Sequence, residues 1–141
     1  MKKNSVLLLM LILAVFGLVL SIYLVQHHYT LSEEPAFCDM SSTVSCSLVN
    51  QSSYAELFHV PVAFYGVLWF LLFIAILFFV YRKKELAKKV LVLWTGSGFL
   101  FVLYLLYAEY KVGALCPWCT LVHIDIFVLL ALTLYLYRKK V

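Results

Sequence analysis

Two cysteines near the end of the chain have the spacing of a redox pair. Cys116 and Cys119 stand three residues apart, around Pro117 and Trp118. Pro117 suits the first turn of a helix, because its fixed φ fits there and its missing N–H would have no partner. The positive end of the helix dipole favours a thiolate, which a reactive cysteine requires. The motif therefore predicts thiol–disulfide chemistry at a helix N-terminus, with a structural disulfide or half of a metal site as the alternatives.

The composition places the chain in a membrane. Of its 141 residues, 65% are hydrophobic and 13% are charged, whereas soluble domains are about half apolar and about a quarter charged. Windows of about 18–20 residues without Lys, Arg or Glu are long enough to cross a ~30 Å hydrocarbon core as helices. They cover residues 6–25, 62–81, 90–108 and 120–137. We therefore predict an all-α integral membrane protein, a single four-transmembrane-helix bundle over residues 1–141 with an outer loop over 26–61.

The basic residues gather on one side of these windows. Of the 11 Lys and Arg, all but Lys111 lie before the first window, between the second and third, or after the fourth. The positive-inside rule then predicts a multi-pass protein of the plasma or inner membrane with both termini in the cytoplasm. All four cysteines would lie on the extracytoplasmic side, where disulfides form and persist.

The outer loop carries the second cysteine pair. Cys38 and Cys46 are eight residues apart, a separation that a loop closes easily. Farther on, the run Ser53–Glu56 fits a capping box, which predicts a short helix at the membrane interface. His27 and His28 precede the loop, and we expect them to be solvated interface residues.

The last window carries two ionisable residues on opposite faces. At 100° per residue, His123 lies about 20° from Cys116 and one turn below Cys119, so these three share a face. Asp125 lies about 180° from Cys116. We expect His123 to have a functional role and Asp125 to pair with a polar group on a neighbouring helix.

Two cysteine pairs on one side of a membrane suit one task. Electrons from thiols in water must reach an acceptor in the bilayer, and a single dithiol cannot easily face both. An exposed loop pair can meet a soluble partner and a pair at a helix mouth can meet a lipid carrier, with thiol–disulfide exchange between the pairs. Because the sequence has no haem or flavin motif, we expect a quinone as the acceptor, and no nucleic acid as a partner.

The order of these motifs resembles a known family. Cys38 and Cys46 come first, the run Ser53–Phe58 leads to Pro61, and the C-x-x-C motif opens the last helix. This order, over nearly the whole chain, is similar to single-domain bacterial members of the vitamin K epoxide reductase family. The DsbB family has the opposite order, with C-x-x-C before the loop pair, and is therefore the second choice.

The resemblance implies a four-helix bundle around a quinone of the menaquinone, ubiquinone or phylloquinone type. Cys38 would receive electrons from an extracytoplasmic thioredoxin-fold partner, Cys46 would pass them to Cys116, and Cys119 would reduce the quinone. Ser52 matches a serine in the loop helix of the family. His123 occupies a quinone-side position that vertebrate members fill with Tyr. Together with aromatic residues near the outer face, the candidate quinone-binding residues are Ser52, Phe64, Tyr65, Tyr107 and His123.

The chain also departs from the family pattern. His59 stands where bacterial relatives usually have Gly, and Val62 stands where many have Asn. Many relatives carry a fused thioredoxin-like domain, whereas this chain ends at Val141, so we expect the partner to be a separate protein. Two alternatives come from other functional classes. One is a four-helix scaffold with structural disulfides, and the other is a small transporter that would use Asp125 as its membrane-embedded carboxylate.

Overall fold

The computed structural model describes residues 3–30 and 38–139, and four long helices account for most of them. Each is long and apolar enough to cross a membrane, so the predicted four-helix membrane architecture is confirmed. The helices are α1 (Lys3–Tyr29), α3 (Val62–Tyr81), α4 (Glu85–Val112) and α5 (Pro117–Arg138). Three of them extend beyond the apolar windows, because backbone hydrogen bonding continues past the point where polar side chains begin.

The ends of two helices follow the local chemistry of the sequence. Cys116 is the N-cap of α5 and Pro117 occupies its first turn, as expected from the missing N–H of proline. Helix α4 ends at Val112 and is followed by Gly113, whose φ of 72° is left-handed. Glycine adopts this conformation without steric cost and is therefore common just after a helix.

The four helices form a closed ring in which α1 and α4 each pack against both α3 and α5. Close packing depends on Gly17 of α1, because a Cβ atom there would collide with the Phe70 ring and with Oδ2 of Asp125. The expectation that Asp125 pairs with a polar group is wrong, since neither of its oxygens has a hydrogen-bond partner among the described residues. Its neighbours on α1 and α3 are a glycine and an aromatic ring.

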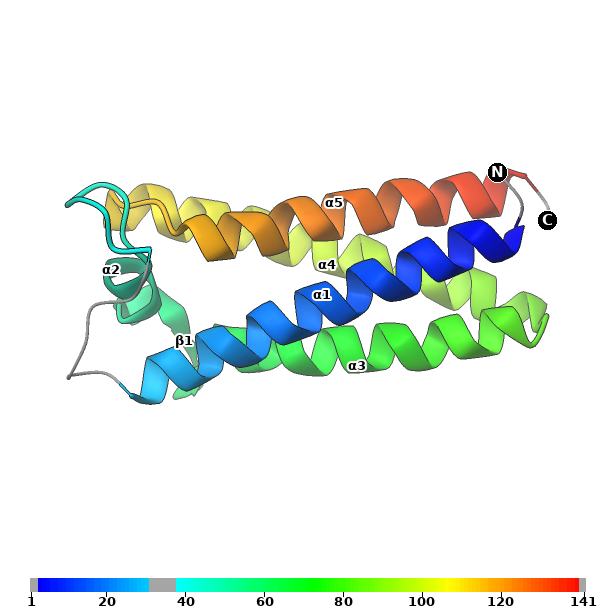
Figure 1. Cartoon of the computed structure of the whole chain (residues 1–141), viewed down its shortest axis with the longest axis horizontal. Coiled ribbons are helices and arrows are strands. Elements are labelled where there is room, and N and C mark those ends of the chain that lie inside the picture. Colours follow the sequence, from blue (N-terminus) through cyan, green and yellow to red (C-terminus); the bar gives the residue numbers. More distant parts are fainter. Residues whose placement is uncertain (1–2, 31–37, 140–141) are drawn as a thin grey trace.

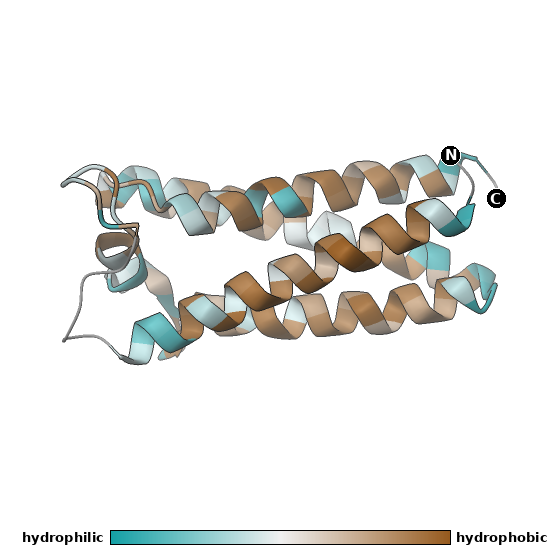
Figure 2. Cartoon of the chain, in the orientation of Figure 1, coloured by the Kyte–Doolittle hydropathy of each residue, from teal (hydrophilic) through white to brown (hydrophobic). Residues whose placement is uncertain are grey.

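The two ends of the bundle differ in structure (Figure 1). The start of α1, the end of α5 and the tight α3–α4 turn lie together at one end. The short elements between α1 and α3 and the connection from α4 to α5 lie at the other end. Hydrophobic residues line the length of the helices and hydrophilic ones concentrate toward the ends (Figure 2). Both cysteine pairs therefore belong to the end opposite the α3–α4 turn.

The outer loop contains α2 (Cys46–Asn50), the 3₁₀ turn η1 (Ser53–Ala55), and a small antiparallel hairpin of β1 (Glu56–Leu57) and β2 (Val60–Pro61). The loop helix starts earlier than predicted. Ser45 caps α2 by accepting a hydrogen bond from the Leu48 N–H at 3.2 Å. The predicted capping box does not form, because Glu56 enters the hairpin and its side chain contacts His28 instead.

The turn of the hairpin is strained. Phe58 and His59 both have positive φ, 55° and 62°, and a two-residue turn with two positive φ values favours glycine and asparagine. The structure thus gives a physical reason why a glycine suits position 59.

Candidate active site

The four cysteines form two disulfides that lie against each other. Cys38 is bonded to Cys46, and Cys116 is bonded to Cys119; we call these the loop pair and the helix pair. The Sγ atoms of Cys46 and Cys116 are 3.3 Å apart. Residues 70 positions apart in the sequence are therefore placed at the distance at which sulfur atoms can react.

The loop pair is buried, contrary to the expectation that it is exposed. Cys38 is 2% exposed and Cys46 is fully buried. They pack with Cys116 and with Leu24 of α1. In this oxidised form the folded loop itself shields the sulfur atoms from solvent.

A short backbone contact holds the loop beside the helix pair. The Leu115 N–H donates to the Thr43 carbonyl at 2.8 Å, and the Ser45 N–H donates to the Leu115 carbonyl at 3.0 Å. Leu115 directly precedes Cys116 and Ser45 directly precedes Cys46. This parallel bridge therefore fixes the register that brings the two sulfur atoms together.

Asp39 organises the loop around Cys46. Its Oδ1 accepts hydrogen bonds from the Ser45 hydroxyl at 2.7 Å and from the Ser47 N–H at 3.0 Å. Its Oδ2 accepts one from the Ser47 hydroxyl. A carboxylate that accepts from the first turn of a helix is also favoured by the helix dipole, so Asp39 stabilises α2 as well as the loop.

The start of α5 holds the helix pair. The Cys116 Sγ accepts a hydrogen bond from the Cys119 N–H at 3.2 Å, and the Thr120 hydroxyl donates to the Cys116 carbonyl at 2.9 Å. Cys116 is fully buried, while Cys119 is partly exposed. Of the helix pair, therefore, Cys116 faces the loop pair and Cys119 faces the interior of the bundle.

Cys119 borders a cavity of about 480 Å³, a size typical of small-molecule sites. The cavity lies between the short loop elements and the outer halves of the helices, and its lining is mostly apolar. Polar side chains of the lining are those of Ser21, Asn50, Ser52, Tyr54, Tyr65, Trp69, Trp94, Ser97, Glu109 and His123.

Three buried polar atoms of the lining have no hydrogen-bond partner among the described residues. They are the indole Nε1 of Trp69, Nδ1 of His123 and Oε1 of Glu109. His123 is 3% exposed and Glu109 is 8% exposed. Unpartnered buried groups are costly in a folded protein and are common where a ligand supplies the missing partner. The cavity therefore has the features of a site for an apolar molecule with a few hydrogen-bonding groups.

The position of Glu109 also gives a group of metal-ligand type. One of its oxygens and the sulfur atoms of Cys116 and Cys119 all lie within 4.8 Å of one another. The two sulfur atoms are bonded to each other, however, and a metal needs free thiolates. In this oxidised form the two sulfur atoms are therefore not available as metal ligands.

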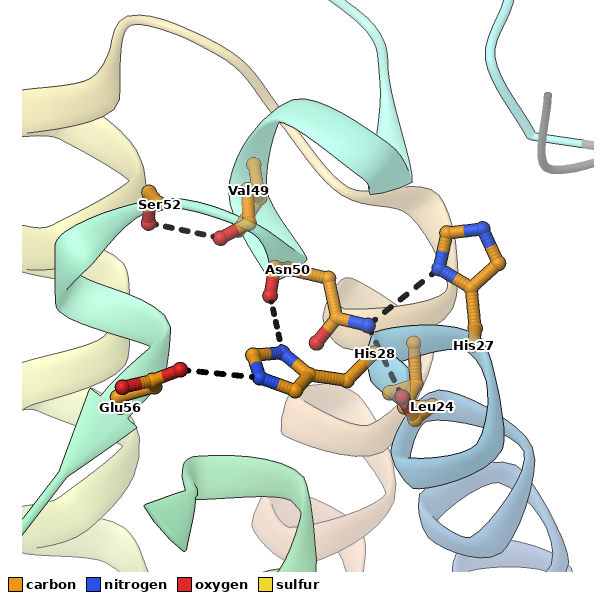
Figure 3. Close-up of polar contacts among 7 residues, drawn as sticks. All are labelled: Leu24, His27, His28, Val49, Asn50, Ser52 and Glu56. Carbon is orange, nitrogen blue, oxygen red and sulfur yellow. Dashed lines mark hydrogen bonds and ion pairs between the residues drawn. The ribbon is translucent and has the colours of Figure 1, made fainter. Parts of the chain in front are cut away.

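A polar cluster ties the outer loop to α1 (Figure 3). One nitrogen of His28 lies 2.7 Å from the Asn50 carbonyl and the other lies 3.2 Å from Oε1 of Glu56. The Asn50 side chain donates to the Leu24 carbonyl at 2.9 Å. The expectation that His28 is solvated is wrong, since it is 6% exposed. It is shielded because α2 and β1 fold over the end of α1.

The comparison with known families decides between the alternatives. The profile of the vitamin K epoxide reductase family matches residues 8–134. The chain belongs to this family. Among curated proteins, none matches the chain. Family membership makes it a membrane thiol–disulfide oxidoreductase, and members of the vitamin K epoxide reductase family use quinones and thioredoxin-like partners in general.

The structure brings together some of the candidate quinone-binding residues of this vitamin K epoxide reductase relative. Ser52, Tyr65 and His123 line the cavity. The Ser52 hydroxyl donates to the Val49 carbonyl at 2.8 Å, and the Tyr65 hydroxyl donates to the Leu57 carbonyl at 3.0 Å. Both hydroxyls are thus engaged with the loop, and of the three only His123 retains an unpartnered nitrogen.

Phe64 and Tyr107 lie outside the cavity lining. They are 42% and 52% exposed, on helix faces that point away from the bundle. Successive helical residues point about 100° apart, so Phe64 cannot share the direction of Tyr65. Two tryptophans that are not among the candidate quinone-binding residues line the cavity, Trp69 and Trp94, whose rings stack at 6.2 Å.

Val62 also lines the cavity. Its position is the one where many members of the family have Asn, and a valine has no hydrogen-bonding group to offer a ligand. In this chain the polar contacts to a ligand must come from other side chains.

Proposed function

We propose that the chain oxidises an extracytoplasmic thioredoxin-fold partner through the loop pair and passes the electrons through the helix pair to a membrane quinone. The observation that carries the proposal is the 3.3 Å separation between the Sγ atoms of Cys46 and Cys116. Reacting atoms at about 3–3.5 Å are in the near-attack range, which removes most of the entropic cost of bringing them together.

The exchange follows from the connectivity of the sulfur atoms. A partner thiolate attacks the Cys38 Sγ, the Cys38–Cys46 bond breaks, and Cys46 leaves as a thiolate. Cys46 then attacks the Cys116 Sγ, and the Cys116–Cys119 bond breaks. Because Cys38 is 2% exposed, we expect the loop to move before the partner can reach it.

The cavity fits a quinone in size and chemistry. A bound quinone accepts two electrons and two protons. His123 and Trp69 would hold it, because each offers a buried nitrogen with no hydrogen-bond partner among the described residues and a quinone oxygen can accept from either. Cys119 lies in the same lining, so electrons leaving the helix pair do not have to cross further protein.

The cavity also extends to the membrane-facing side of the bundle. Its lining includes Leu68 and Leu72 of α3, which are 44% and 50% exposed, and Ser97 of α4, which is also exposed. Helices α3 and α4 are adjacent. A lipid-soluble molecule would enter between them without passing through water. Asp125, in contrast, lies outside the lining, which disfavours the transporter alternative.

A single-turnover experiment tests the relay. Wild-type protein, purified with native lipid, is mixed with a reduced thioredoxin-fold protein, and quinone reduction is followed by absorbance. We expect Cys38→Ser and Cys46→Ser to lose this reaction, while a small dithiol that reaches Cys116 directly still drives it slowly. Full protein-driven turnover in the Cys38→Ser variant would rule out the relay. Extraction of the bound lipid identifies the quinone.

The orientation is tested by thiol labelling in intact cells. From the charge bias we propose that both termini are cytoplasmic. After reduction, an impermeant reagent applied outside should label the loop pair, whereas a cysteine placed at Lys84 in a cysteine-free background should react only after permeabilisation. The opposite pattern would reverse the orientation and the compartment of the substrate.

A further inference from the structure

Glu109 lies beside the helix pair, and its carboxyl group accepts a hydrogen bond from the Cys116 backbone N–H. One of its carboxylate oxygens is within 4.8 Å of the Sγ atoms of both Cys116 and Cys119. The side chain comes from the last turn of α4, is 8% exposed and lines the cavity. Its Oε1 has no hydrogen-bond partner among the described residues. The hydrogen bond to Cys116 holds the carboxyl group at the helix pair, and the unpartnered buried oxygen, which is costly in itself, remains available for chemistry.

The exchange between the two pairs creates a need for a proton at this place. When Cys46 attacks Cys116, the Cys46–Cys116 bond forms and the Cys116–Cys119 bond breaks. The electron pair of the broken bond leaves on the Cys119 Sγ. That atom borders a mostly apolar cavity, where an unpaired thiolate is costly.

We propose that Glu109 is the proton carrier of the helix pair. Its carboxylic acid donates a proton to the Cys119 Sγ as this sulfur leaves Cys116. When Cys119 is later oxidised, the Glu109 carboxylate takes the proton back from the thiol, so the carboxyl group ends each cycle as it began. This second half rests on the proposed quinone reduction, but the first half does not. A gap of up to 4.8 Å is closed by one bridging water or a rotation of the side chain.

Other polar groups near the cavity are less suited to this role. The hydroxyls of Ser52 and Tyr65 donate to the carbonyls of Val49 and Leu57. Asp125 is the other buried carboxyl of the bundle, 4% exposed, but it lies outside the cavity lining. Asp125 therefore provides a matched control, because its neutralisation removes a buried carboxyl group that does not line the cavity with Cys119.

The test follows the two pairs separately in quinone-free protein. Full-length protein in detergent, stripped of quinone, is mixed with excess dithiothreitol. Samples are quenched with acid, alkylated, and analysed by mass spectrometry for reduction of the loop pair and of the helix pair. In Glu109→Gln we expect the loop pair to be reduced at the wild-type rate and the helix pair at least about tenfold more slowly. The effect is smaller than the ~10²–10⁴ typical of general acids, because a thiolate is already a fair leaving group.

Two further variants make the result specific. Glu109→Asp keeps the carboxyl group and should recover part of the rate of helix-pair reduction. Asp125→Asn should leave the rates of both pairs within twofold of wild type. A normal loop-pair rate shows that a variant is folded around its cysteines. If Glu109→Gln changes the rate of loop-pair reduction as well, the test becomes the rate of helix-pair reduction in Glu109→Asp compared with wild type.

Wild-type rates for the helix pair in Glu109→Gln would overturn the proposal. So would a slow helix pair in Glu109→Asp equal to that in Glu109→Gln, because the carboxyl group would then have no specific role. Failure of the proposed function looks different. It would appear as wild-type protein that reduces no added quinone, and it would leave the quinone-free rates unchanged.

Discussion

The two disulfides of this protein contain the same bond, but they are held by different kinds of structure. The loop pair depends on contacts within a short polar segment, chiefly the hydrogen bonds of Asp39 to Ser45 and Ser47. The helix pair is built into the first turn of α5, where Cys116 is the N-cap. Loops open at lower free energy than packed helices, so the loop pair is the one suited to meet a protein partner.

Burial reinforces this difference. Cys38 and Cys46 are shielded by the loop that carries them, whereas Cys119 faces a cavity lined by all four long helices together with the loop elements α2 and η1. Local opening of the segment around Cys38 would expose the loop pair, while the walls that the four long helices give the cavity stay in place. In the proposed relay, a protein partner would reach the loop pair and a lipid-soluble molecule would reach the cavity at Cys119. The contact between Cys46 and Cys116 would connect these two places.

Removal of one cysteine of the helix pair should have the largest effect. Cys119→Ser should abolish quinone reduction by any dithiol, because Cys119 is the sulfur atom at the cavity. The remaining Cys116 thiol should instead become trapped in a disulfide with Cys46, which is 3.3 Å away in the native protein. Peptide mass spectrometry of non-reduced protein would detect this bond.

Cys116→Ser provides the control for the Cys46–Cys116 disulfide expected in Cys119→Ser. It should also abolish quinone reduction, but it lacks the α5 sulfur atom that lies 3.3 Å from Cys46, so no bond between the loop and α5 should accumulate. A Cys46–Cys119 disulfide in this variant would contradict the division of roles between the two cysteines of the helix pair.

Loss of the His123 imidazole should have an intermediate effect. His123→Phe keeps much of the volume and removes a buried nitrogen that has no partner among the described residues. A positioned donor stabilises charge that develops on an oxygen. We expect kcat for quinone reduction to fall by about 10–100-fold, while exchange between the two pairs stays intact in stopped-flow measurements.

His123→Gln serves as the matched variant, because its amide retains a hydrogen-bond donor. It should recover part of the rate that His123→Phe loses. Unchanged quinone kinetics between pH 6 and 8 in His123→Phe would reduce His123 to a packing residue. Trp69 would then be the remaining candidate donor, since its Nε1 is also buried without a partner in the described parts of the chain.

Much of the fold could be predicted from the sequence. Apolar windows predicted the four long helices because a membrane-spanning helix must satisfy its backbone internally. Helical periodicity placed His123 on the face of α5 that carries Cys116 and Cys119, and Pro117 marked the start of this helix. These features depend on residues close together in the sequence.

The rest depends on contacts between distant segments. Nothing local in the sequence indicates that His28 would be covered by Asn50 and Glu56, or that Glu56 would leave its capping box for a hairpin. Likewise, Asp125 found no partner because the helix beside it presents Gly17. The signal for Glu109 was present, an acidic residue seven positions before Cys116, but its direction depends on how α4 packs against α5.

The smallest expected effect concerns the hairpin at the outer end. His59 has a φ of 62°, in a region that costs a residue with a Cβ atom roughly 1 kcal/mol or more. His59→Gly relieves this strain, although it also raises the entropy of the unfolded chain. We therefore expect a net gain of about 0.5 kcal/mol or less in the free energy of local opening.

Amide hydrogen exchange at Leu57 and Val60, which pair across the hairpin, would measure this gain as slower exchange. Met40→Gly is the control, since Met40 lies in the same loop at a non-positive φ and should show only the entropic loss, with faster exchange at Val44. The hairpin contains none of the four cysteines, so a firmer turn should leave reduction of the helix pair unchanged. If reduction of the helix pair slowed as much as exchange at Leu57, the loop and the cavity would open together, and their separation would not hold.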